Sequence, residues 1–157
     1  MVSVSEEGKL VTQTAERQAS LTHTGEELTE GRHYWEVELV EDLPLLGVCR
    51  PDADPRAEHG GRADTTVWLM DAGDGTLWGN GKHVSDAAGE FDKGDRMGIL
   101  LDLDDGSLRF FKNGVEQGPG YPAGSVTGPV ALAAHMHYEG NAARLLPDAA
   151  WPAGHTR

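Results

Sequence analysis

Short runs of alternating apolar and polar residues occupy most of this sequence and predict β-strands. Glycine, with 21 residues, and proline, with 8, separate the runs. Closely spaced short strands with such turn residues are typical of an all-β sandwich or barrel. No window shows a helical period longer than two turns. The runs expected to form strands are KLVTQ, RHYWEVELVE, LLGVCR, TTVWLMD, GTLWGN, RMGILLDL, SLRFFKN, PVALAAHMHYE and AARLLP.

The run RHYWEVELVE shows the alternation over the greatest length. One of its faces is apolar enough to lie in the core and consists of His33, Trp35, Val37 and Leu39. The other face is expected to be the solvent side and consists of Tyr34, Glu36, Glu38 and Val40. Because side chains alternate across a strand, this run predicts a strand that is buried on one side only.

Four carboxylates lie within the apolar stretch between Gly98 and Gly118, and they raise the question of a calcium loop. They are Asp102, Asp104, Asp105 and Glu116. An EF-hand loop needs glycine at its sixth position and a bidentate glutamate at its twelfth. Counted from Asp102, the glycine comes one residue early and Asn113 occupies the twelfth position. The stretch DAGDG fails in a similar way, so we do not expect a calcium site in either.

The dipeptide Asp105-Gly106 predicts a β-hairpin instead, because a type I′ turn requires positive φ at both of its central residues. The register that follows sets apolar residues opposite apolar residues and one acid opposite a cation: Leu101 with Phe110, Leu103 with Leu108, and Asp102 with Arg109. Asn113-Gly114 predicts a second turn of the same type, which returns the segment VEQ alongside. The acids are therefore interpreted as turn and surface residues.

The chain is acidic and fits a single domain. Its 157 residues contain 13 Lys and Arg against 26 Asp and Glu, a formal net charge of −13. A negative field repels nucleic acid and anionic membranes, so we expect neither as a partner. The length suits one core, which we place in residues 1–147. The tail from Pro147, PDAAWPAGHTR, is rich in Pro and Ala and resembles a linker that leaves the domain, which we place at residues 148–157.

Cys49 is the only cysteine, so no disulfide can form within the chain, and its apolar neighbours predict a buried thiol in a core strand. The N-terminal residues lack the basic-then-apolar order of a signal peptide. No apolar run approaches the roughly 20 residues that cross a bilayer. We therefore expect an intracellular protein, cytoplasmic or nuclear.

Few residues suggest catalysis or metal binding. Glu36 and Glu38 lie two apart on one strand face, and glycosidases need two carboxyls about 5 to 10 Å apart; a solvated acidic face explains the pair better. The seven histidines show no HExxH motif and no paired Cys/His spacing. His135 and His137 could ligate zinc together, but no further ligand is evident. We expect no catalytic residues, no cofactor and no bound metal.

Several blocks of the sequence resemble the SPRY domain family. They are LTEGRHYWEVEL, LGVCR with VWLM and GTLWGNGKHV, FDKGDRMGILLDLDDGSLRFFKNGVEQG, and GPVALAAHMHYEGNAARLLP. Together they run in order from about Ser5 to Pro147. The stretch VSEEGKLVTQTAERQASLTHTG resembles, less sharply, the PRY-type N-terminal extension of the tripartite-motif branch.

The resemblance implies a bent antiparallel β-sandwich that binds peptides or proteins through loops at one end. It implies a monomeric module, and often the substrate-recognition part of a ubiquitin ligase or a scaffold. Carried over to this chain, the partner-binding residues are Arg17, Gln18, Arg50, Asp52, Arg56, His59, Arg62, His137 and Tyr138. His137 stands near a position where the peptide-binding branch uses Trp, so no specific peptide motif is transferred.

Two alternatives stay open at this stage. The arginines between Arg50 and Arg62 pair with acids of the same loop in one interpretation, and bind a partner in the other. The same sandwich architecture also occurs in carbohydrate-binding lectins and glycoside hydrolases. A sugar site needs an exposed Trp platform, and Trp68 and Trp78 have the sequence context of core or half-core residues.

Overall fold

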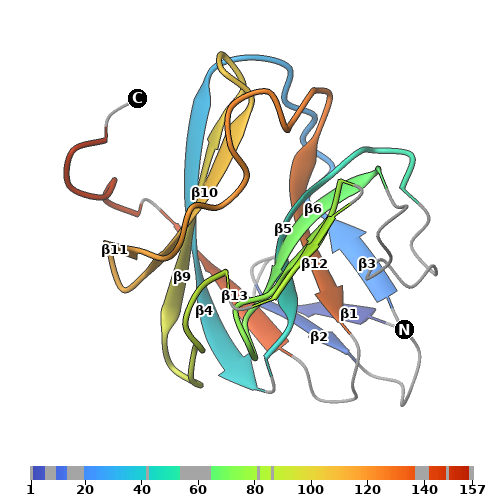
Figure 1. Ribbon diagram of the computed structural model, residues 1–157. Helices are drawn as coiled ribbons and strands as arrows, with labels where there is room; N and C mark the ends of the chain where they lie inside the picture. The colour runs from blue at the N-terminus through green and yellow to red at the C-terminus, as the bar shows by residue number, and fades with distance from the viewer. Residues whose placement is uncertain are drawn as a thin grey trace.

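The computed structural model describes residues 2–5, 10–13, 20–41, 43–53, 65–80, 82–85, 87–136, 142–147 and 149–155. They form a sandwich of two antiparallel sheets, and none of them lies in a helix (Figure 1). The larger sheet contains, in spatial order, β1 (Val2–Ser5), β2 (Leu10–Gln13), β13 (Ala142–Leu146), β4 (Arg32–Glu41), β9 (Arg96–Asp102), β10 (Ser107–Lys112) and β11 (Val115–Glu116). The smaller sheet contains β3 (Ser20–His23), β12 (Ala131–Met136), β5 (Leu45–Cys49), β6 (Val67–Asp71), β7 (Leu77–Gly79) and β8 (Lys82–Val84).

The all-β sandwich predicted from the sequence is confirmed. Each of the nine runs expected to form a strand contains one, and β11 is the return segment predicted after the second turn. The sequence pattern missed β1, β3 and β8, which are only three or four residues long. Strands this short show too few alternating residues to be predicted from sequence, and they are recognised by their pairing with other strands. Ser20 of β3, for example, pairs with Met136 of β12.

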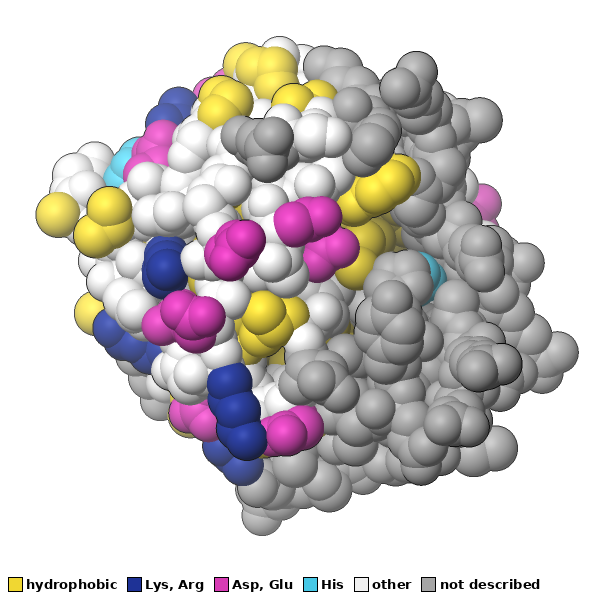
Figure 2. Space-filling model, turned by 60° about the horizontal axis from the view of Figure 1, so that its bottom comes forward, with side chains coloured by type: hydrophobic (Ala, Val, Ile, Leu, Met, Phe, Trp, Pro, Cys, Tyr) yellow, Lys and Arg dark blue, Asp and Glu magenta, His cyan; other side chains and the backbone are white. Residues whose placement is uncertain are grey.

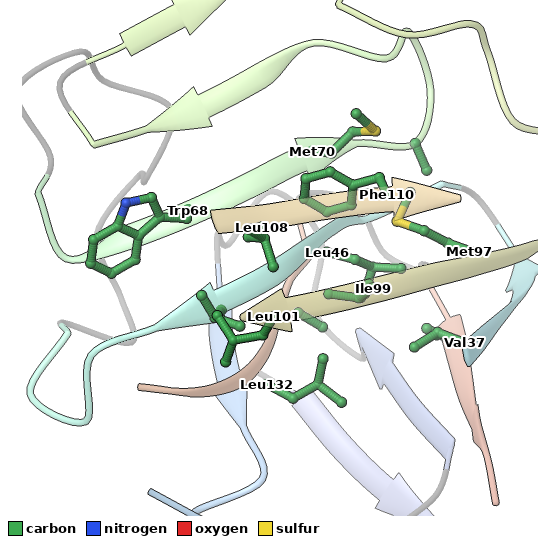
Figure 3. Close-up of a cluster of buried hydrophobic side chains, with 14 of the residues drawn as sticks. Val37, Leu46, Trp68, Met70, Met97, Ile99, Leu101, Leu108, Phe110 and Leu132 are labelled. Atoms are coloured by element: carbon green, nitrogen blue, oxygen red, sulfur yellow. The ribbon is translucent and has the colours of Figure 1, made fainter. Parts of the chain in front are cut away.

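The core lies between the two sheets, where the inward-facing side chains meet (Figure 3). Val37, Ile99 and Phe110 come from the larger sheet, and Leu46 and Met70 come from the smaller one. All five are at most 4% exposed. Because the pattern has a period of two, each strand contributes alternate residues to this layer.

A second cluster of buried residues lies on the other face of the smaller sheet. It includes Leu45, Cys49, Val67 and Leu69, all of them at most 1% exposed. The predicted burial of the Cys49 thiol is confirmed. This sheet is therefore buried on both faces, which explains the nearly continuous apolar character of LLGVC and VWLM.

The predicted register of the β9–β10 hairpin is wrong by two residues. Leu108 pairs with Leu101 rather than Leu103, and Ser107 pairs with Asp102. The Asp102 side chain explains the longer loop, because its Oδ1 accepts hydrogen bonds from the N–H groups of Asp104 (3.0 Å) and Asp105 (3.2 Å). A shift of two residues keeps every side chain on its predicted face.

The predicted pairing of Asp102 with Arg109 is also wrong, because Arg109 lies opposite Leu100 in the observed register. Asp102 Oδ2 instead lies 3.1 Å from Arg32 Nε, and Arg109 lies 3.3 Å from Glu116. The second turn is as predicted: Asn113 and Gly114 have φ values of 48° and 88°. The interpretation of Asp104, Asp105 and Glu116 as turn and surface residues is confirmed, since all three are exposed.

The outer face of β4 is less exposed than predicted. Glu36 is only 7% exposed, although it was assigned to the solvent side. It accepts a hydrogen bond from the Tyr34 hydroxyl at 2.8 Å and pairs with Arg96 at 3.1 Å. Burial, followed by the hydrogen bond to Glu36, raises the pKa of Tyr34 well above its usual value. The alternation along β4 does not reveal the burial of Glu36, because Arg96 comes from β9, 60 positions away in the chain.

Replacing Phe110 by Ala should destabilise the domain by about 3 to 5 kcal/mol, because it removes a fully buried aromatic ring and leaves a cavity. Urea denaturation measures the change in the free energy of unfolding. Val115→Ala is the matched control: Val115 is 65% exposed, and its loss should change stability by no more than about 0.5 kcal/mol. Similar costs for the two substitutions would contradict the assignment of the core.

Asp71→Asn should stabilise the domain at neutral pH. Burial raises the pKa of the Asp71 carboxyl, so the folded protein disfavours its charged form. An asparagine Oδ1 can still accept the 2.7 Å hydrogen bond from the Gly73 N–H. The charged Asp71 destabilises the fold fully above its pKa in the folded protein, and not at all below its pKa in the unfolded chain. The gain in stability from Asp71→Asn should therefore vanish at about pH 3. Urea denaturation at both pH values tests this; an equal benefit at both would rule out ionisation as the cause.

Candidate functional site

Four loop segments form one end of the sandwich, which we call the rim: residues 24–31, 50–53, 103–106 and 117–130. Backbone hydrogen bonds connect them directly. The Leu103 N–H donates to Gly31 O at 2.9 Å, and the Gly124 N–H donates to Asp105 O at 2.8 Å. Leu28 and Val130 exchange bonds of 2.8 and 3.0 Å. The rim is therefore a set of loops fixed to one another as well as to the sheets.

Arg50 lies at this rim, directly after β5, and several contacts fix its position. Its Cζ lies 5.4 Å from the centre of the Trp68 ring. Its Nη2 donates to the Thr127 hydroxyl at 2.5 Å, and its backbone N–H donates to Thr66 O at 2.8 Å. A guanidinium above an indole ring gains a cation–π interaction and keeps its edge available for hydrogen bonds.

Trp68 connects this arginine to the core. The side chain is 1% exposed, and its indole N–H donates to Ser125 O at 2.9 Å. Sequence analysis identified Arg50 but missed the roles of Ser125 and Thr127. Thr127 lies 77 positions from Arg50 in the chain, and no spacing motif connects the two.

Of the predicted partner-binding residues, only Arg50 and Asp52 lie within the described residues, and Asp52 is exposed. The others are outside the described residues: Arg17, Gln18, Arg56, His59, Arg62, His137 and Tyr138. The strand register still indicates where their segments begin. Cys49, next to Arg50, pairs with Ala131 at the start of β12, whereas Ser20 pairs with Met136 at its end.

The predicted residues therefore branch from two ends of one strand. Positions 17–18 precede Ser20 and positions 137–138 follow Met136, while the loop from Arg50 to Arg62 leaves the opposite end. Ala131 and Met136 are about 17 Å apart at the usual rise of a strand. A single pocket that contains all nine residues stays a prediction.

Acids outnumber cations on the described part of the rim. Glu26, Glu27, Glu30, Asp52, Asp104 and Asp105 are exposed. Arg50 and Arg32 are half-buried, and Arg32 lies against Asp102. Elsewhere charges of opposite sign are adjacent, as Figure 2 shows for one face of the molecule. The described rim thus presents one fixed cation within an acidic surrounding.

The groups considered for catalysis or metal binding are engaged elsewhere. Glu36 pairs with Arg96, and Glu38 pairs with Arg144 at 2.8 Å. His135 is fully buried, and His137 is not described. No group of three potential metal ligands occurs in the described part of the chain. All four tryptophans are described, and each is buried or half-buried, so the described surface offers no exposed Trp platform for a sugar.

The family model for the SPRY domain matches residues 32–145. A curated relative, the E3 ubiquitin-protein ligase TRIM11 of Bos taurus, is 36% identical over 89 residues, which are 55% of this chain and 18% of that protein. The chain thus spans under a fifth of that relative. No helix among the described residues is long and apolar enough to cross a membrane.

Solved SPRY structures have the same fold. The SPRY domain of human HERC1 has a TM-score of 0.79 and 18% identity, with 92% of this chain and 91% of that chain covered. A human SPRY domain has a TM-score of 0.75 and 20% identity, with 95% of this chain and 96% of that chain covered. The PSpry domain of TRIM65 has a TM-score of 0.71 and 22% identity, with 92% of this chain and 85% of that chain covered. At these identities the likeness establishes the fold alone.

Arg50→Ala should lower the free energy of unfolding by only about 0.5 to 1.5 kcal/mol, because it removes one cation–π contact and one side-chain hydrogen bond at a partly exposed position. Arg50→Lys should cost less, since it keeps a cation near the Trp68 ring. Chemical denaturation measures both. Loss of cooperative unfolding in Arg50→Ala would make this arginine a structural residue.

Proposed function

The chain belongs to the SPRY domain family, and we propose that it is a protein-interaction module that binds a peptide or protein segment at its rim. The observation that carries the proposal is the fixed guanidinium of Arg50, placed by Trp68 and Thr127 on interconnected loops. Loops on a rigid scaffold are the usual place for recognition, and arginine is among the residues enriched at binding hot spots.

The partner proposed for this site is a segment of acidic or mixed charge. One of its carboxylates pairs with Arg50, since a guanidinium offers planar, bidentate donors. The acids around the rim favour basic groups on either side of that carboxylate and oppose a uniformly acidic segment. Asp52, Arg56, His59 and Arg62 follow Arg50 in the chain and belong to the proposed contact set at the rim. The family resemblance also implies Arg17, Gln18, His137 and Tyr138, although their neighbours Ser20 and Met136 lie at the opposite end of β12.

The wider context is also a proposal. The similarity to a protein named an E3 ubiquitin-protein ligase supports a role as the substrate-recognition part of a ligase or scaffold. We propose that the domain works inside the cell, in the cytoplasm or nucleus, as a monomer and without catalysis of its own. The net charge of −13 supports a protein partner over nucleic acid or an anionic membrane.

Affinity capture from a native lysate, read out by mass spectrometry, tests this function with the full chain as bait. Arg50→Ala and Arg62→Ala should each reduce recovery of the specific partners at least about tenfold, as expected for hot-spot residues. Lys93→Ala is the matched control, because Lys93 is an exposed cation that pairs with Glu41 at the far end of β4. It should leave recovery unchanged.

Thermal melting of each variant separates binding from folding. The proposal requires that the melting temperature of the arginine variants stays within a few degrees of the parent value. Equal recovery of partners by the parent chain and by Arg50→Ala would contradict a role for the rim. Specific binding on a glycan array would favour the carbohydrate-binding alternative.

A further inference from the structure

Residues 149–155, which we call the C-terminal segment, lie on the outer face of the larger sheet. The Trp151 ring is 5.8 Å from the Tyr34 ring, and the His155 ring is 5.6 Å from the Phe111 ring in an edge-on arrangement. Pro152, between them, is buried. In Figure 1 the red segment lies beside the larger sheet, on the side away from β5, β6 and β12. The stretch expected to be a linker thus contacts the domain.

Side chains alone attach this segment to the sheet. Among the described residues, its one recorded backbone hydrogen bond is internal, from the His155 N–H to Pro152 O at 3.1 Å. The polar contact with the sheet is long, with His155 Nε2 4.0 Å from Glu116 Oε1, and it is an ion pair only when His155 is protonated. Without a backbone ladder, the segment can leave the sheet while the strands stay paired.

The face beneath the segment needs a cover. Phe111 and Leu100 are each 2% exposed and Glu36 is 7% exposed, although all three point away from the inter-sheet core. Uncovering two large apolar side chains costs about 1.5 to 3 kcal/mol for each that becomes fully exposed. A displaced segment must therefore be replaced by another apolar group.

The segment leaves space at the edge of β4. A pocket of about 210 Å³ lies there beside Trp151, lined by Arg32 and Tyr34 of the outer face and by His33 and Trp35 of the opposite face. The strand β13 pairs with β4 only as far as Glu36, so among the described residues no strand covers this part of β4 on the β13 side. A competing segment can bury additional side-chain area here.

We propose that the outer face of β4, β9 and β10 is a second binding surface, which takes a segment of a partner protein carrying a Trp-Pro pair, and that the C-terminal segment occupies it in cis. The bound segment itself defines the chemistry. A tryptophan lies against Tyr34, a proline follows it, and a basic residue four positions after the tryptophan faces Glu116 near Phe111. This surface is separate from the rim.

The test uses a labelled peptide of residues 149–155, AAWPAGH, and fluorescence polarisation with the full chain. Trp151→Ala empties the aromatic contact in cis, so this variant should bind the peptide at least about tenfold more tightly than the parent chain, whose own segment competes at a high effective concentration. The same peptide with Ala in place of Trp should not bind. Adding Glu116→Ala to Trp151→Ala should weaken binding only slightly, because the contact between His155 and Glu116 is long and exposed.

Two controls keep the outcome interpretable. The double variant Arg50→Ala with Trp151→Ala should bind the peptide as well as Trp151→Ala alone. The proposal for the outer face and the proposal for the rim can therefore each be rejected without affecting the other. Should Trp151→Ala not fold, the indole N–H resonance of Trp151 in the parent chain replaces it as the readout, and excess peptide should shift it.

A folded Trp151→Ala variant that binds no more tightly than the parent chain would overturn the proposal, as would an indole resonance that excess peptide leaves in place. Dimers of the parent chain that Trp151→Ala abolishes, seen by gel filtration, would also overturn it, because the face would then take the segment of a second copy.

Discussion

The burial of Trp68 connects the core of this domain to the loops of its rim. The indole ring lies between the sheets, its N–H holds the 117–130 loop through Ser125 O, and its face supports the Arg50 guanidinium. These three contacts form only if β5 and β6 pair in register and the loop before β12 reaches across both. The rim is thus positioned by sheet packing, and loop composition alone does not determine where Arg50 lies.

The parts of the fold that depend on alternation within one strand could be predicted from the sequence, and those that depend on contacts between segments could not. Alternation with a period of two assigns each side chain to a face, so the strands β4, β9 and β10 were predicted correctly, and Val37 and Leu39 of β4 lie in the core as expected, whereas His33 is only half-buried. The length of the β9–β10 loop was not, because it depends on the Asp102 carboxylate accepting two backbone N–H groups. That contact is local but has no simple sequence signature, since Asp105-Gly106 equally suits a shorter turn.

Burial by distant segments was harder to predict. Glu36 lies in a strand whose alternation indicates an outer, solvated position, and yet it pairs with Tyr34 and Arg96, and the Tyr34 ring is itself in contact with Trp151. The same difficulty applies to the site: Arg50 could be chosen from its loop, whereas Thr127 and Ser125 become its neighbours only through the sandwich. Sequence patterns specify which face a residue occupies, and long-range packing decides what covers that face.

The two surfaces differ in how they are maintained, and this difference has consequences for binding. The rim is fixed by backbone hydrogen bonds between loops, so a partner meets preorganised groups and loses little free energy in ordering them. The outer face is covered by a segment held through side chains, so a partner must displace it and gains only the difference between two similar contacts. The two surfaces adjoin at the start of β4. The first residues of this strand line the pocket beside Trp151, and Gly31 of the rim, directly before it, accepts a hydrogen bond from the Leu103 N–H. A segment bound at the rim, as proposed, therefore lies next to the proposed second surface, so each bound segment can limit the space that is left for the other.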